Sequence, residues 1–262
     1  MTVFLKGCPL RCMWCHNPEG QAFQSEVVRS PNGCLFCNAC LCEGEKKTGR
    51  PVLVPESISV CPRNLVRLCG EEISSHDLVK RIDKVVELLK LSGGGVTFSG
   101  GEPLAQPEFL RECLALLRGR VHRAIQTSGF CDPLLFSKIL ADCDYVLFDL
   151  KHMDPAIHQK YTGQSNEKIL QNYQTLVKSK KEFITRIPLI PSVNDTAENL
   201  QATAAFLHEN GVRRIELLPY NKSAGAKYRL IGKEYVTDFD GNIPPSPHTE
   251  IFEQYQIEVK VL

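Results

Sequence analysis

From residue 72 onward, short apolar runs alternate with amphipathic segments, and this alternation constrains the fold more than any other feature of the chain. Repeated strand–helix units predict parallel strands joined by helical crossovers. With 262 residues, of which 43% are hydrophobic, the chain suits one large α/β domain with a small insert, built as an open sheet or a full or partial barrel. The predicted strands are 2–5, 95–99, 124–127, 145–149, 183–188, 214–219 and 258–261, and the predicted helices are 78–89, 109–117, 133–141, 167–179 and 196–210.

Charge and hydropathy exclude several classes of function. The formal net charge is +1, from 31 basic and 30 acidic residues, so nothing favours nucleic acid or an anionic membrane as the main partner. No apolar run approaches the length of a membrane span, and the N-terminus lacks the order of a signal peptide. We therefore expect a cytoplasmic protein.

Polar and glycine residues follow four of the predicted strands, at 99–102, 127–129, 149–151 and 219–221. Parallel α/β folds carry their active sites at the carboxyl ends of their strands. Four strand ends therefore point to one catalytic edge.

Cys8, Cys12 and Cys15 stand in a C-x3-C-x2-C pattern directly after the first predicted strand. A [4Fe–4S] cluster normally takes four thiolates, so three would leave one iron open to a small molecule. S-adenosylmethionine (SAM) could bind that iron through its amino and carboxylate groups and be cleaved by an electron from the cluster. A zinc site made of these thiols and His16 is the alternative.

The segment 4–19, Phe-Leu-Lys-Gly-Cys-Pro-Leu-Arg-Cys-Met-Trp-Cys-His-Asn-Pro-Glu, resembles the cluster loop of glycyl radical enzyme activating enzymes, a family of radical SAM enzymes. The resemblance continues in order along nearly the whole chain, through 93–104, 149–151, 186–195 and 217–220. It implies a partial (β/α)6 TIM-like radical SAM barrel. It also implies reductive cleavage of SAM and abstraction of a Cα hydrogen from a glycine of a partner glycyl radical enzyme, with flavodoxin or ferredoxin as electron donor.

The same resemblance assigns residues to the SAM site. Cys8, Cys12 and Cys15 would hold the cluster, and Met13 and Trp14 would lie near the adenine. The segment that ends the second strand would receive the SAM amino group. Asn221 stands where the family pattern carries a histidine, and an amide can hydrogen-bond but cannot become a cation. The assigned cofactor-binding residues are Met13, Trp14, Cys15, Gly100, Gly101, Glu102, Asp149, Leu150, Lys151, Arg186 and Asn221.

Residues 21–71 interrupt the alternation, show no sustained helical period and carry six cysteines. Two all-cysteine cubanes would need eight thiolates, so we expect one auxiliary [4Fe–4S] cluster in a ferredoxin-like insert. Its expected ligands are Cys34, Cys37, Cys40 and Cys61, and a zinc site with four thiolates is the alternative. The roles of Cys42 and Cys69 stay open. The chain thus divides into 1–20 (first strand and cluster loop), 21–71 (insert) and 72–262 (rest of the barrel).

Two other functions compete with the activase hypothesis. A radical SAM enzyme could act on a small molecule, as 7-carboxy-7-deazaguanine synthase does, but such enzymes usually lack this insert. A non-enzymatic iron–sulfur electron carrier would not explain polar residues at the ends of four strands. The family also carries a segment before the first strand, whereas this chain starts at Met1, so a truncated N-terminus stays open. The sequence identifies neither the partner enzyme nor the oligomeric state.

Overall fold

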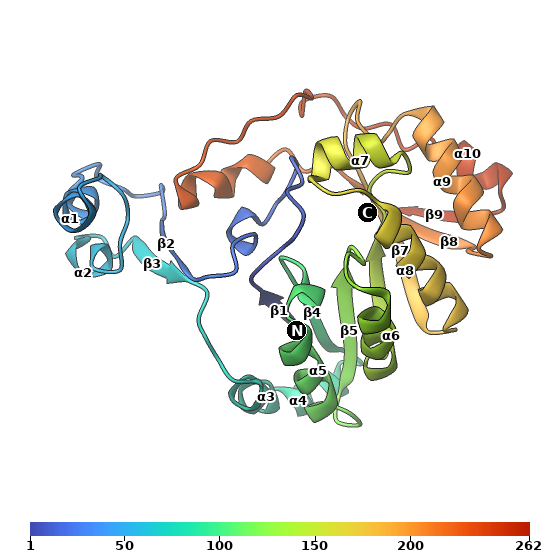
Figure 1. Ribbon diagram of the computed structural model, residues 1–262, viewed down its shortest axis with the longest axis horizontal. Helices are drawn as coiled ribbons and strands as arrows, with labels where there is room; N and C mark the ends of the chain where they lie inside the picture. The colour runs from blue at the N-terminus through green and yellow to red at the C-terminus, as the bar shows by residue number, and fades with distance from the viewer.

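The computed structural model describes residues 1–262 and has an α/β fold built on a seven-stranded sheet. The strand order is β1-β4-β5-β6-β7-β8-β9, and every neighbouring pair is parallel. Because β1 and β9 each have one neighbour, the sheet does not close, which confirms the prediction of a partial barrel (Figure 1). The strands are β1 Thr2–Leu5, β4 Gly95–Gly100, β5 His122–Thr127, β6 Tyr145–Asp149, β7 Glu182–Leu189, β8 Arg214–Pro219 and β9 Glu258–Val261.

Helices connect the strands and cover the outer face of the sheet (Figure 1). Side chains of Ser74, Asp132, Asp154 and Thr196 cap four of these helices by accepting backbone hydrogen bonds in the first turn, which is the strongest local start signal. The helices of this layer are α3 Ser75–Asp83, α4 Val86–Leu91, α5 Pro107–Leu116, α6 Pro133–Asp142, α8 Glu167–Lys178, α9 Ala197–Glu209 and α10 Thr249–Gln254. α7 Pro155–Thr162 lies instead at the carboxyl ends of the strands, beside the loop that follows β1 (Figure 1).

The main core lies between the helices and the sheet and contains 34 buried residues. Phe98, Phe148 and Tyr173 are fully buried, and the rings of Phe148 and Tyr173 meet edge to face with centroids 5.1 Å apart. Each such side chain contributes about 2–3 kcal/mol through burial. This packing fixes the strands rigidly, so the loops at their carboxyl ends are held in place.

The insert forms a second, small unit beside the barrel (Figure 1). β2 Glu26–Arg29 and β3 Val66–Cys69 pair antiparallel in a sheet of their own, and α1 Ala39–Thr48 and α2 Ser57–Val60 lie between them in the chain. A 3-10 turn, η1 Pro18–Gly20, ends the loop of residues 6–20 that follows β1, here called the cysteine loop, and leads into this unit.

A long segment after β8 lies across the open side of the barrel. Its 3-10 helix η3 Ala224–Ile231 contacts both η1 and β2, and the chain then returns over the barrel to α10 (Figure 1). No helix of the protein is both long enough and apolar enough to cross a membrane.

Candidate active site

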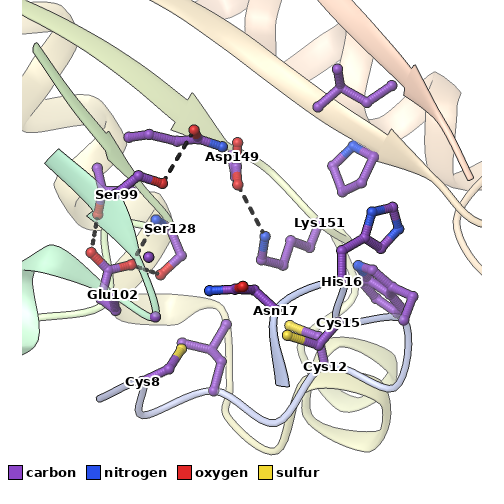
Figure 2. A pocket seen from close by; sticks show the side chains of 18 of the residues that line it. Cys8, Cys12, Cys15, His16, Asn17, Ser99, Glu102, Ser128, Asp149 and Lys151 are labelled. Carbon is purple, nitrogen blue, oxygen red and sulfur yellow. Dashed lines mark hydrogen bonds and ion pairs between the residues drawn. The ribbon is translucent and has the colours of Figure 1, made fainter. Parts of the chain in front are cut away.

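A cavity of about 290 Å³ opens at the carboxyl ends of the barrel strands. Cys8, Cys12 and Cys15 all line it, and the four polar strand ends predicted from the sequence converge on it. Figure 2 shows the sulfur atoms of Cys12 and Cys15 together and that of Cys8 apart from them, with Asn17 between in this view. The predicted catalytic edge therefore exists as one site.

Backbone hydrogen bonds hold the cysteine loop from two sides. Gly7 N donates to Gly20 O at 2.8 Å, which closes the loop on itself. Arg11 N donates to Thr162 O at 2.6 Å, and Met13 N donates to Tyr161 O at 3.0 Å. The end of α7 thus positions the loop, although sequence reasoning did not predict that helix.

Burial makes the three thiols weak acids. It raises the pKa of Cys8 to about 11 and that of Cys12 to about 12, and it also raises the pKa of Cys15; the Lys151 ammonium opposes these shifts only in part. Buried thiolates need a cationic partner, and bound iron would supply one. The donor set therefore fits a metal centre.

The arrangement of the thiols also bears on the kind of centre. No three Cys, His, Asp or Glu side chains converge closely enough to share one metal ion. Each thiolate ligand of a cubane binds its own iron, so a cluster requires only that the thiols surround a common space. Three thiols around this cavity meet that requirement.

Glu102 ties the end of β4 to the end of β5. Its carboxylate accepts hydrogen bonds from Thr127 Oγ1 at 2.6 Å, from Ser128 N and Oγ at 2.8 and 2.6 Å, and from Leu104 N at 3.2 Å. Burial raises the pKa of Glu102, whereas the Ser128 and Thr127 donors lower it. Both carboxylate oxygens of Glu102 accept hydrogen bonds from the protein. In the segment 100–102, a ligand would therefore contact the backbone rather than the Glu102 side chain.

Gly100 and Gly101 allow the cysteine loop to pack directly on β4. A Cβ on Gly101 would lie 2.3 Å from Gly20 O and 2.4 Å from Gly7 O, and Gly100 has a φ of +119°. Neither position accepts a side chain without movement of the backbone.

Asp149 and Lys151 form an ion pair in the cavity, with Lys151 Nζ 3.4 Å from Asp149 Oδ2 (Figure 2). Burial acts against the ammonium, but Asp149 and the thiols of Cys12 and Cys8 raise the pKa of Lys151 above its ordinary value. Asp149 Oδ1 is buried without a hydrogen-bond partner. An unpaired buried carboxylate oxygen is costly in the free protein, and a ligand ammonium would satisfy it.

Four residues assigned from the resemblance do not line the cavity: Met13, Leu150, Arg186 and Asn221. Leu150 is a core residue. Arg186 lies between Asp149 and Glu216 in the sheet register, with Nε 3.5 Å from Glu216 Oε2. Asn221 is exposed and accepts a hydrogen bond from Ser223 N. Their contact with SAM stays a prediction.

The insert brings four of its six cysteines around a second, much smaller cavity of about 10 Å³. Backbone N–H groups of Phe36 and Leu65 and the Arg29 guanidinium each donate to a cysteine sulfur at 3.4 Å. These bonds stabilise negative charge on sulfur, as ligand thiolates require. Cys42 and Cys69 do not line the cavity, whereas the predicted ligands Cys34, Cys37, Cys40 and Cys61 do.

Residues 2–207 match the radical SAM superfamily. The chain is 36% identical, over 92% of its length and 83% of the relative's, to a 4-hydroxyphenylacetate decarboxylase activating enzyme of Clostridioides difficile (strain CD196). It is 35% identical, over 89% of its length and 82% of the relative's, to a choline trimethylamine-lyase activating enzyme of Oleidesulfovibrio alaskensis. The chain belongs to the glycyl radical enzyme activating enzymes. A solved domain of a pyruvate-formate lyase-activating enzyme from Bacteroides vulgatus superposes with a TM-score of 0.52 at 30% identity, covering 64% of this chain and 99% of that domain.

In this activating enzyme, sequence reasoning missed several contacts of the site. Ser128 and Tyr220 line the cavity, as the predicted catalytic edge implied, but sequence reasoning gave neither of them a role. Lys227 Nζ on η3 lies 2.7 Å from Glu19 Oε1 and 2.9 Å from Asn17 Oδ1, which ties the segment after β8 to the cysteine loop. Such contacts join residues far apart in the chain. The only feature of the sequence that pointed to them was the polar character of the two loops.

Acid should weaken the support that α7 gives to the cysteine loop. His158 is buried; its Nδ1 lies 2.6 Å from Gln164 O, and its Nε2 has no hydrogen-bond partner. Burial lowers the pKa of His158 from 6.5 to about 4. In the unfolded chain the ring protonates near its ordinary pKa, so stability is fully present above about pH 6.5 and falls as the pH drops toward 4.

We expect the free energy of unfolding of the metal-free protein to fall by about 2 kcal/mol from this group between pH 7.5 and 5. Urea titrations at the two pH values measure this, and His158→Asn should remove that part of the pH dependence. His76→Asn, at an exposed position, should keep the wild-type dependence. Equal pH dependence in wild type and His158→Asn would show that His158 is not the responsible group.

Proposed function

We propose that this chain reductively cleaves SAM and abstracts a Cα hydrogen from a glycine of a partner glycyl radical enzyme. One observation supports this most strongly: the three thiols of the C-x3-C-x2-C loop and the polar ends of four parallel strands line a single cavity. Cys8, Cys12 and Cys15 would hold a [4Fe–4S] cluster, which would supply the electron that splits SAM into methionine and a 5′-deoxyadenosyl radical. That radical would take the Cα hydrogen, which would give 5′-deoxyadenosine and leave the radical on the partner's glycine.

The residues of the cavity divide that task. Cys8, Cys12 and Cys15 hold the cluster, and the backbone at Gly100 and Gly101 approaches the methionine part of SAM. The unpaired Asp149 Oδ1 receives a ligand N–H, and Lys151 offers its ammonium to a carboxylate. Burial of this group of charges excludes water and strengthens each contact.

The partner glycine enters from the open side of the barrel, between β1 and β9. Lys227 and η3 lie on that side against Asn17 and Glu19. A glycine held inside its own enzyme must leave that site to reach the cavity, so docking includes release of a loop of the partner.

We also propose a redox role for the insert. Cys34, Cys37, Cys40 and Cys61 hold one auxiliary metal centre, of which an iron–sulfur cluster is the form that carries electrons. Residues 21–71 act as a unit of their own beside 1–20 and 72–262, since β2 and β3 form a separate sheet, and η3 contacts this unit at β2. The electron donor is flavodoxin or ferredoxin, and the protein works in the cytoplasm, where its twelve free thiols stay reduced.

The test of this function is anaerobic reconstitution of the full chain with iron and sulfide, followed by dithionite, SAM and a candidate glycyl radical enzyme. We expect 5′-deoxyadenosine by chromatography and an organic radical doublet on the partner by electron paramagnetic resonance. Cleavage of SAM with no radical on the partner would instead favour a small-molecule substrate.

The assignment of the insert ligands makes a separate prediction. Cys61→Ala should lose the auxiliary centre, a decrease of about four irons per chain if the centre is a cubane. Cys42→Ala should keep the wild-type iron content, because Cys42 is exposed and outside the second cavity. Metal analysis that finds zinc in the wild type and its loss in Cys61→Ala would replace the cluster with a zinc site, and equal metal loss in both variants would contradict the four-ligand assignment.

A further inference from the structure

We propose that the surface around the second cavity docks the electron donor through an acidic face of that donor. This surface, here called the insert face, consists of Arg29, Leu35, Phe36, Pro62 and Arg63. The proposal rests on the proposed function, since it supplies the electron that SAM cleavage consumes.

Exposed apolar side chains surround the four thiols of the insert. Leu35 is 58% exposed and Phe36 is 73% exposed, and they stand between Cys34 and Cys37. Phe36 has a φ of 52°, a conformation that a bulky residue rarely adopts. Large apolar side chains presented in this way next to a metal-binding loop are typical of a contact surface.

The charged side chains of the insert face, Arg29 and Arg63, are both positive. Arg29 and Arg63 line the second cavity, and neither forms a salt bridge with an acidic side chain. The two segments that supply the thiols, residues 27–42 and 57–70, contain no Asp or Glu. The acidic residues that flank these two segments in the chain are already paired: Glu26 with Lys6, Glu43 with Lys46, Glu56 with Lys47, and Glu71 with Arg81.

These features together define the occupant. An apolar centre flanked by two arginines that lack carboxylate partners matches an acidic protein surface, which it would attract over a distance at low ionic strength. The four thiols lie close to this surface, because all four line the second cavity and Cys37 is itself exposed. A donor seated here would bring its redox group next to the auxiliary centre, so the insert face selects an electron donor rather than the glycyl radical enzyme.

The test is a binding measurement that does not depend on turnover. Calorimetry would follow the binding of an acidic flavodoxin, in its oxidised form, to the reconstituted enzyme. The double variant Phe36→Glu and Arg63→Glu should raise the Kd at least about tenfold, with iron content unchanged. Wild-type affinity should fall as salt is added.

A matched control is available on the barrel. Leu134 is 76% exposed and Lys138 is exposed, and both lie on α6 far along the chain from the insert. Leu134→Glu with Lys138→Glu changes the same kinds of side chain and the same net charge, so its Kd should stay within about twofold of wild type.

Three outcomes would overturn the proposal: unchanged flavodoxin binding in the insert variant, an equal loss in the control variant, or a loss of binding to the glycyl radical enzyme instead. SAM cleavage driven by dithionite separates this proposal from the function itself. That cleavage should survive in the insert variant, and its absence from the wild type would defeat the proposed function without bearing on where flavodoxin binds.

Discussion

Cys12→Ala should lower the formation of 5′-deoxyadenosine at least about a thousandfold, equivalent to about 4 kcal/mol. Cys12 is one of three thiols on the cavity, and the pKa of each is raised by burial. Loss of one thiolate leaves an iron without its protein ligand, so the site loses the centre that supplies the electron. The measurement is chromatography of anaerobic reactions with dithionite and SAM.

Cys113→Ala is the control for this loss. Cys113 is fully buried in the main core, outside both cavities, so its replacement creates only a small void that costs about 1 kcal/mol of stability. It should retain near wild-type cleavage. Wild-type activity in Cys12→Ala would show that the cysteine loop is not the cluster site.

Gly101→Ala should decrease SAM cleavage about a hundredfold and destabilise the protein by about 1–3 kcal/mol. The added methyl group would lie 2.3 Å from Gly20 O and 2.4 Å from Gly7 O. These are backbone atoms of the cysteine loop, so the loop must shift away from β4 by about an ångström, which misplaces the thiols. Steady-state cleavage and urea unfolding measure the two effects.

Gly94→Ala provides the matched comparison. Neither Gly94 nor Gly101 has a positive φ, but a methyl group on Gly94 meets no backbone atom closer than 3.6 Å. Gly94→Ala should therefore leave cleavage and stability close to wild type. Equal effects of the two substitutions would mean that close packing of the loop on β4 does not matter.

Most strands of the barrel could be predicted from the sequence, because their local residue pattern agrees with their place in the sheet. The predicted bounds of β1, β6, β8 and β9 match the structure. Each is a short run in which apolar residues are continuous or alternate with polar ones. The helix predicted at 78–89 is instead broken into α3 and α4, because the chain turns at Lys84 and Val85. Apolar spacing persists across that break, so periodicity alone could not reveal it.

Among the helices that were not predicted, α7 and α1 were missed for different reasons. α7 is short, and its signals are only the Asp154 cap, Pro155 and the closing Gly163. α1 carries Gly44 in its middle, where a Cβ would lie 1.7 Å from Val52 O. That glycine lowers the helical propensity but permits the close packing that tertiary structure requires. In both cases contacts distant in sequence decide the local structure.

The metal ligands of the candidate site could be predicted from the sequence, but the hydrogen bonds that position the site could not. Thiol spacing identified Cys8, Cys12 and Cys15, because metal chemistry dictates ligand type and number. The hydrogen bonds of Glu102 to Thr127 and Ser128 depend on which strands are neighbours. The sequence does not state that register, and the pairing of Arg186 with Glu216 was hidden for the same reason.

Deuterium labelling tests directly whether the 5′-deoxyadenosyl radical takes its hydrogen atom from the partner's glycine. The partner glycyl radical enzyme would be produced with glycine deuterated at Cα, and mass spectrometry would examine the 5′-deoxyadenosine formed with this chain. We predict 5′-deoxyadenosine that carries one deuterium, formed in step with the radical on the partner. 5′-Deoxyadenosine without deuterium would contradict the account, because the hydrogen would then come from something other than the partner's glycine.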